Sequence, residues 1–335
     1  MKAYVVRKGA TGLEQLQRVE LPDPQPAAGQ ILVRMRAASI NYRDQMIVIG
    51  RYMGGAVTRD TIPLSDGAGE VVETGSGVTR FKVGDRVVST FFQGWVDGPP
   101  PGPLPALGGS VDGMLAEYVV FDQSNAVLLP GTLSYEEGST LSCAGVTAWN
   151  AIVRIGDVKP GHTVLVLGSG GVSIFAAQLA KAAGARVIMT SSSDEKLARA
   201  RELGVDTGVN YSRTPDWEQE VVKATNGRGV NCVVEVGGAG TLARSMRSIG
   251  YAGRIALIGF LAGPQGDTSP APIMVKGGSL HGVFVGSRAM LEELGSAIDT
   301  NGIRPVIDRV FNFQSVHDAF DYQKRGAFGK VVIQI

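Results

Sequence analysis

The first 126 residues alternate between apolar and polar positions in the manner of short β-strands. Runs such as ILVRMRAASI, GEVVETGSGV and DRVVSTFF are separated by turns rich in Gly, Pro and Asp. Strands spaced in this way predict a barrel or a sandwich. One stretch, residues 93–113, has no periodicity and many Pro and Gly residues, so we expect a functional or mobile loop there.

From about residue 127 the pattern changes to apolar runs that alternate with segments of helical periodicity, which predicts an α/β domain with a parallel sheet. We expect this domain to span 127–287, and 288–335 to return to the first domain, 1–126, with KVVIQI as the last strand. The predicted strands are Thr163–Leu167, Arg186–Thr190, a short one near Val209, Asn231–Val236, Arg254–Ile258 and Leu280–Val285. The predicted helices are Val172–Ala183, Glu195–Leu203, Trp217–Ala224 and Thr241–Ile249.

Composition narrows the class of protein. A chain of 335 residues suggests roughly two domains. Its net charge of +1 creates no strong electrostatic field that would attract nucleic acid or an anionic membrane surface. Two distant cysteines, Cys143 and Cys232, exclude a disulfide framework. No apolar run approaches the roughly 18 residues that would span a bilayer. We expect a cytoplasmic protein with no nucleic-acid or membrane partner.

The most informative motif is TVLVLGSGGVSIFAAQLAKAAGARVIMT, in which a buried strand meets a helix at a glycine-rich turn. Gly168 allows the tight turn, and Gly170 lets the backbone approach a pyrophosphate at the helix N-terminus. Gly171 and Val172 continue the turn, and Ser173 stands where Gly or Ala is usual. The strand before it and the helix after it make this a predicted dinucleotide site.

The end of the next strand carries hydroxyls where an NAD enzyme has an acid, about 20 residues past the glycine turn. Without that acid a ribose 2′-phosphate is not repelled, and hydroxyls with a cation can bind it. We therefore favour NADPH over NADH, with NAD possible. A capping box, Ser192 to Glu195, explains the same residues without a ligand, and both roles are compatible. The predicted phosphate-binding residues are Ser191, Ser192, Ser193 and Lys196.

Beyond the glycine turn, the segments DGAGEVVETGSGVTRFKVGDRV, LSCAGVTAWNAI, LGVDTGVNY, GRGVNCVVEVGG, GRIALIG and GKVVI make the chain similar to the medium-chain dehydrogenase/reductase superfamily over essentially its whole length. The resemblance implies a GroES-like β-barrel catalytic domain joined to a doubly wound Rossmann cofactor domain. It also implies a homodimer.

Members of this superfamily differ in whether they use zinc. The Cys, His and Cys that hold the catalytic zinc of the alcohol dehydrogenases match Asn41, Ser65 and Cys143 here. A single thiolate cannot hold a zinc ion that needs three protein ligands. Residues 93–113, where the structural zinc lobe would fall, contain no cysteine. We therefore expect no metal.

The chain resembles the zinc-independent quinone oxidoreductases of the superfamily in particular. That resemblance implies that Asn41 lies by the nicotinamide and that Asp44 and Tyr52 face the cleft. Tyr52 could donate a hydrogen bond or a proton, and barrel packing is an equal alternative for it. The resemblance also implies further residues near the cofactor. These are Thr147 by the nicotinamide ribose, Tyr211 by the 2′-phosphate and Arg288 by the phosphates.

Three functions remain open from the sequence. The first is a zinc-free NADPH-dependent oxidoreductase that transfers hydride to a quinone or an α,β-unsaturated carbonyl compound, whose developing charge is delocalised. The second is an NAD(P)-dependent alcohol dehydrogenase or carbonyl reductase that uses side-chain donors. The third is a nucleotide-binding redox sensor without turnover. The expected partner of the enzyme is a small-molecule substrate.

Overall fold

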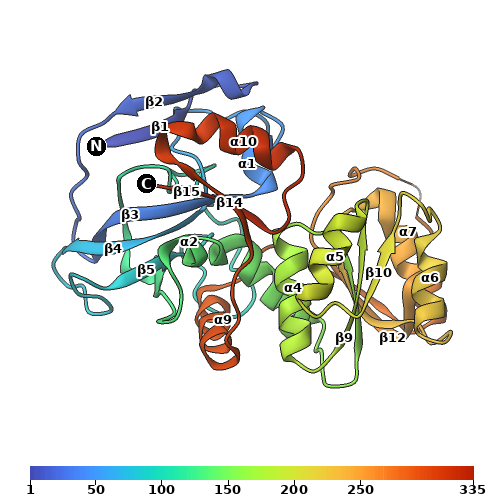
Figure 1. Cartoon of the computed structure of the whole chain (residues 1–335). Helices are drawn as coiled ribbons and strands as arrows, with labels where there is room; N and C mark the ends of the chain where they lie inside the picture. Colours follow the sequence, from blue (N-terminus) through green and yellow to red (C-terminus); the bar gives the residue numbers. More distant parts are fainter. Residues whose placement is uncertain (267) are drawn as a thin grey trace. The chain divides into compact units, whose positions relative to one another are not determined.

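The computed structural model describes residues 1–266 and 268–335, which form two compact units (Figure 1). The first contains Met1–Val146 and Ser287–Ile335, and the second contains Thr147–Gly286. The division lies after Val146 instead of residue 126. Helix α2 (Tyr135–Gly138) explains the difference, because it packs against strands β3 and β4 of the first unit. The expected fold class, a β-rich GroES-like domain with an α/β cofactor domain, is confirmed.

The first unit is built on a seven-stranded sheet of order β14-β15-β3-β4-β5-β7, with β6 also paired to β3, and on a two-stranded sheet of β1 and β2. Apolar side chains of these strands and of α10 form its core. The strands are β1 (Lys2–Val6), β2 (Leu16–Glu20), β3 (Gln30–Ile40), β4 (Asp66–Thr74), β5 (Arg86–Ser89), β6 (Tyr118–Asp122), β7 (Ala126–Leu128), β14 (Ile307–Asn312) and β15 (Lys330–Gln334). The helices, besides α2, are α1 (Tyr42–Val48), α9 (Arg288–Asn301) and α10 (Val316–Lys324), with short turns η1 (Leu13–Gln15), η2 (Gln123–Asn125), η3 (Leu141–Gly145) and η5 (Phe313–Ser315).

The last strand of the chain lies inside the first unit's sheet, between the edge strand β14 and β3. Strand β15 runs parallel to β14 and antiparallel to β3, with Val331 opposite Ile40. This register brings Lys330, the residue before Val331, and Asn41, the residue after Ile40, to the same end of the sheet. A residue near the C-terminus thereby meets one from the first fifty residues.

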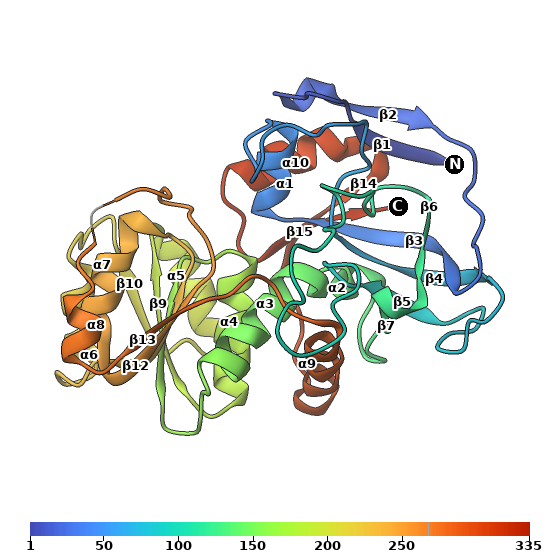
Figure 2. The same cartoon turned by 180° about the vertical axis from the view of Figure 1, so that it is seen from behind.

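The second unit is a six-stranded parallel sheet of order β10-β9-β8-β11-β12-β13, the doubly wound order of dinucleotide-binding domains. Figures 1 and 2 show α4 and α5 on one side of the sheet and α6 and α7 on the other. Each expected element is present, and β12 begins earlier than expected. The strands are β8 (Thr163–Leu167), β9 (Arg186–Ser191), β10 (Thr207–Asn210), β11 (Val230–Glu235), β12 (Ile249–Leu257) and β13 (Ser279–Gly282). The helices are α3 (Val146–Trp149), η4 (Asn150–Ile155), α4 (Gly171–Ala182), α5 (Asp194–Glu202), α6 (Trp217–Ala224), α7 (Ala239–Ser248) and α8 (Ala271–Val275).

Within the described residues, no helix combines the length and the apolar character needed to cross a membrane.

Candidate functional site

The glycine-rich turn lies between β8 and α4, where the strand order reverses and doubly wound sheets bind their ligands. Gly168 has φ +71°, a conformation that favours glycine, and Gly170 is the N-cap of α4. The departure at Ser173 has a structural reason. Its hydroxyl donates to the Leu167 carbonyl at 2.6 Å, so the side chain ties the helix to the strand instead of separating them.

Three serines, Ser191, Ser192 and Ser193, form a row of hydroxyl groups that runs from the end of β9 to the start of α5. Ser191 is 2% exposed, and its Oγ accepts the Ser193 N–H at 3.3 Å. The expected capping box from Ser192 is wrong, because Ser193 is the N-cap and accepts the Lys196 N–H at 3.3 Å. Ser193 has the extended backbone that a cap needs, one residue later than expected. Ser192 is exposed and takes no part in the cap.

The acid nearest to the hydroxyl row already has partners. Asp194 accepts a hydrogen bond from Asn210 Nδ2 at 2.8 Å and forms an ion pair with Arg213. Tyr211, between these two partners, donates its backbone N–H to the Ser191 carbonyl and is 42% exposed. Arg213 thus compensates the charge of Asp194 and brings a cation to the loop after β10.

The other two residues expected near the cofactor lie in different settings. Thr147 is the first residue of the second unit, is 2% exposed, and lies between the π-helical segments η3 and η4, a geometry frequent at functional sites. Arg288 begins α9 in the first unit. Its guanidinium donates to the Ser124 carbonyl at 3.1 Å and lies 3.4 Å from Glu292.

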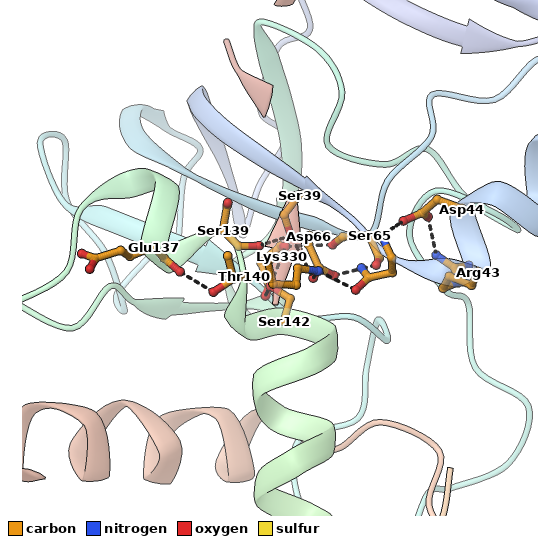
Figure 3. A network of polar contacts seen from close by, with 12 residues as sticks. Ser39, Arg43, Asp44, Ser65, Asp66, Glu137, Ser139, Thr140, Ser142 and Lys330 are labelled. Atoms are coloured by element: carbon orange, nitrogen blue, oxygen red, sulfur yellow. Dashed lines mark hydrogen bonds and ion pairs between the residues drawn. The ribbon is translucent and has the colours of Figure 1, made fainter. Parts of the chain in front are cut away.

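A buried polar cluster in the first unit contains Asp44, Asp66 and Lys330 (Figure 3). The Lys330 ammonium donates to Asn41 Oδ1 at 2.6 Å and to Asp66 Oδ2 at 3.3 Å. Asp44 Oδ2 accepts the backbone N–H of Asn41 at 2.7 Å. All four residues are 9% exposed or less. The network therefore fixes both the backbone and the side chain of Asn41.

Serines complete the surroundings of Asp66. Ser65 donates to Asp66 Oδ1 at 2.7 Å, and both side chains are fully buried. Ser39 Oγ lies 3.4 Å from Asp66 Oδ2, but the Ser139 carbonyl, at 2.9 Å, is its closer acceptor. Asp66 is thus held by Lys330 and Ser65.

Tyr52 lies in the turn after α1, against Arg43. The Arg43 guanidinium is 5.0 Å from the centre of the Tyr52 ring and 4.6 Å from that of Phe91, and it donates to the Leu107 carbonyl at 2.8 Å. Burial raises the pKa of the Tyr52 phenol, and Arg43 opposes that rise. Tyr52 therefore stays protonated at neutral pH and is available as a donor.

The Asp44 carboxyl has an unusual environment. It is fully buried, and burial raises its pKa to about 6, against the opposing effect of Arg43. Between the ordinary aspartate pKa of 3.8 and about 6, the native state holds a proton that the unfolded chain has released. The free energy of unfolding therefore falls as pH rises through that window.

We expect Asp44→Asn to remove this pH dependence. Relative to the variant, the wild-type protein loses on the order of 2 kcal/mol of unfolding free energy between pH 4 and pH 7. Urea unfolding of both proteins at the two pH values measures it. Asparagine keeps an acceptor for the Asn41 N–H, so the substitution changes the charge and preserves the hydrogen bond. If the difference in unfolding free energy between the variant and the wild type stays constant with pH, Asp44 does not have the raised pKa.

Cys143 is a half-buried residue of the π-helical segment η3. Burial, followed by the charge of Asp66, raises its pKa well above the ordinary value. A thiol that resists ionisation is a poor nucleophile.

The unpatterned loop 93–113 packs in part on the backbone that precedes Ser65. Leu64 has φ +68°, and Met114 donates its backbone N–H to the Leu64 carbonyl at 2.9 Å. A Cβ at Gly108 would lie 2.6 Å from Leu64 N, and one at Gly113 would lie 2.1 Å from Leu64 O. The glycines of this loop thus allow a close approach that holds the strained residue next to Ser65. The aromatic side chains next to and within this loop are buried in the first unit; they are Phe91, Phe92 and Trp95.

Sequence reasoning missed three charged residues of these sites. Lys330 could have been recognised from the sequence, because a lysine that directly precedes a run of apolar strand residues, VVI, is expected to be buried and to need a polar partner. Arg43 is adjacent to Asp44 in the sequence, which could have indicated that it lies in the same site. Arg213 had no signal, because its pairing with Asp194 depends on how the loop after β10 folds back.

Two family models match the chain. Residues 27–131 match the alcohol dehydrogenase GroES-like domain, and residues 171–300 match the zinc-binding dehydrogenase domain. A zinc-type alcohol dehydrogenase-like protein of Schizosaccharomyces pombe is 42% identical, over 99% of each chain. The chain belongs to the medium-chain dehydrogenase/reductase superfamily. It is an NAD(P)-dependent oxidoreductase of this type, with a nucleotide-binding fold.

Further relatives of the superfamily differ in their named reactions. The crystal structure of a Sinorhizobium meliloti 1021 protein, provisionally named an alcohol dehydrogenase, is 40% identical over all of both chains, with a TM-score of 0.92. Prostaglandin reductase-3 of Mus musculus is 30% identical, over 95% of this chain and 84% of its own. Names of both dehydrogenases and reductases therefore occur among similar proteins, and the reaction has to be argued from the residues.

Proposed function

We propose that this oxidoreductase reduces quinones or α,β-unsaturated carbonyl compounds with NADPH and without zinc. The observation that carries the proposal is the cluster of Asn41, Lys330 and Asp66. By the resemblance to the family's alcohol dehydrogenases, Asn41 matches one ligand position of the catalytic zinc, and Asp66 directly follows another, Ser65.

The side chains at the three ligand positions do not fit a zinc ion. Asn41 Oδ1 accepts from the Lys330 ammonium, whose charge opposes a divalent cation beside it. The Ser65 hydroxyl donates to Asp66, and a neutral hydroxyl is not one of the thiolate, imidazole or carboxylate ligands that zinc binds in proteins. Of the three side chains, only Cys143 is of a type that zinc binds. Among the described residues, no three His, Cys, Asp or Glu side chains group as metal ligands.

Without a Lewis acid, the favoured substrate is one whose reduction needs little stabilisation of developing negative charge. Hydride addition to a quinone or to the β-carbon of an enone spreads negative charge onto a carbonyl oxygen, which hydrogen-bond donors can stabilise. Asn41 supplies an amide donor, Tyr52 or water supplies the proton, and Asp44 holds the backbone of Asn41. NADPH is oxidised to NADP⁺ as the acceptor gains one hydride and one proton.

The proposed choice of NADPH rests on the end of β9. Serines stand there in place of an acid, Lys196 follows in the first turn of α5, and Asp194 is paired with Arg213. Because the nearest carboxylate has its charge compensated, the repulsion of a 2′-phosphate is reduced.

The names of two similar proteins favour a second candidate, an alcohol dehydrogenase or carbonyl reductase without zinc. In that case Tyr52 and Asn41 would donate to the oxygen of an isolated carbonyl. This reaction needs stronger hydrogen-bond donors, because the negative charge develops on one carbonyl oxygen instead of being spread over a conjugated system.

We expect the purified protein to oxidise NADPH with 1,4-benzoquinone or an enone after exhaustive treatment with a chelator, at an unchanged rate. We expect no reduction of NADP⁺ by ethanol or 1-hexanol. Absorbance at the NADPH band follows both reactions, with heat-denatured protein as the control for direct reaction of the quinone. Loss of activity on chelation, restored by zinc, would contradict the proposal, and alcohol turnover after chelation would favour the second candidate.

A further inference from the structure

Lys330 is a buried cation in an otherwise apolar strand. It is 3% exposed at the start of β15, and the three residues after it are fully buried and apolar. Removing an ammonium group from water is costly unless acceptors replace the water. Figure 3 shows its side chain reaching Asp66, and the same ammonium donates to Asn41 Oδ1 at 2.6 Å.

This contact determines how the Asn41 amide is oriented. An ammonium group only donates, so it selects the oxygen of the amide and turns the nitrogen away. Asn41 Nδ2 is buried and has no hydrogen-bond acceptor among the described residues. A buried donor without a partner is costly, and such groups are uncommon unless a ligand supplies the acceptor.

We propose that Lys330 is a positioning residue, which holds the Asn41 amide so that its N–H group donates to the carbonyl oxygen of the acceptor. This inference rests on the proposed function. The oxygen gains negative charge as hydride arrives from NADPH, and the donor strengthens with that charge. The ammonium, bonded to the other end of the same amide, draws electrons through it and makes the N–H a better donor.

A structural role for the same residue makes different predictions. If Lys330 only neutralises Asp66, replacing it destabilises the fold but leaves the turnover of the folded protein and its affinity for anions unchanged. Because a single substitution leaves Asp66 buried and unpaired, the decisive variant changes both residues: Lys330→Met with Asp66→Asn. In that variant Ser65 can still donate, to the oxygen of the new amide.

The experiment measures binding of 4-nitrophenolate, a stable oxyanion, to the protein saturated with NADP⁺, together with kcat for an enone. We expect the double variant and Asn41→Asp, which keeps the shape but lacks the N–H donors, to lose about tenfold or more in oxyanion affinity. We expect kcat to fall about 100-fold, as when an oxyanion donor is removed. In both variants we expect the affinity for NADPH, measured by nicotinamide fluorescence, to stay unchanged. The single variant Lys330→Arg keeps a cation at this position, so we expect it to retain part of the wild-type kcat.

Oxyanion affinity and kcat equal to those of the wild type, in a double variant that unfolds cooperatively, would overturn the inference. Failure of the proposed function is a separate result. If the wild-type protein reduces neither quinone nor enone, the proposed substrate class is wrong, while Lys330-dependent binding of 4-nitrophenolate still decides the orientation of Asn41.

Discussion

Gly170→Val is expected to lower the affinity for NADPH by about 30-fold or more while leaving the protein folded. Gly170 has φ −77° and ψ 179°, an extended backbone that valine adopts readily. A Cβ built at this position meets no heavy atom within 4 Å. The fold therefore does not need glycine here. A pyrophosphate that approaches the backbone would meet the new side chain, and losing that approach costs about 2 kcal/mol.

Titration of nicotinamide fluorescence measures the affinity, and thermal unfolding measures the stability. Valine is a poorer N-cap than glycine, so we expect a loss of at most about 1 kcal/mol in stability. Gly131→Val is the matched control, because its Cβ also meets open space, and it should change neither quantity. Wild-type affinity in Gly170→Val would mean that the pyrophosphate does not bind at this turn.

Much of the second unit could be predicted because its information is local. Apolar runs of strand length, the glycine turn and helical periodicity lie within one continuous segment, and the expected strands and helices of this unit are present. The N-cap of α5 was misplaced by one residue because Ser192 and Ser193 are equally good caps. Their backbone geometry decides between them, and the sequence does not contain it.

The polar cluster of the first unit could be predicted only in part. Asn41 and Asp44 follow from the resemblance to zinc-independent relatives. The contact of Asn41 with Lys330 joins residues 289 positions apart and depends on the register of β15 against β3. A shift of one residue in that register would turn Lys330 to the other face of the sheet. Sequence periodicity determines which residues face the core but not which distant strand they meet.

Ser191→Asp is expected to reverse the choice of cofactor. In the wild-type protein we expect NADPH to bind about tenfold more tightly than NADH, which corresponds to ~1.4 kcal/mol. An aspartate at the end of β9 can accept the Ser193 N–H as the serine does, and its second oxygen can accept from the ribose hydroxyls of NADH. Its charge repels a 2′-phosphate, so the ratio of the two affinities should change by about 100-fold.

Ser191→Asn separates charge from size in this test. Asparagine has nearly the shape of aspartate and can accept the same N–H, but it carries no charge, so NADPH should remain the preferred cofactor. If both variants lose the preference equally, the cause is crowding at a side chain that is 2% exposed, not repulsion of a phosphate. If wild-type protein binds NADH as tightly as NADPH, the hydroxyls at the end of β9 serve only to begin α5. The proposed reductase could then use either cofactor, because the contacts of Lys330 with Asn41 and Asp66 do not involve the 2′-phosphate.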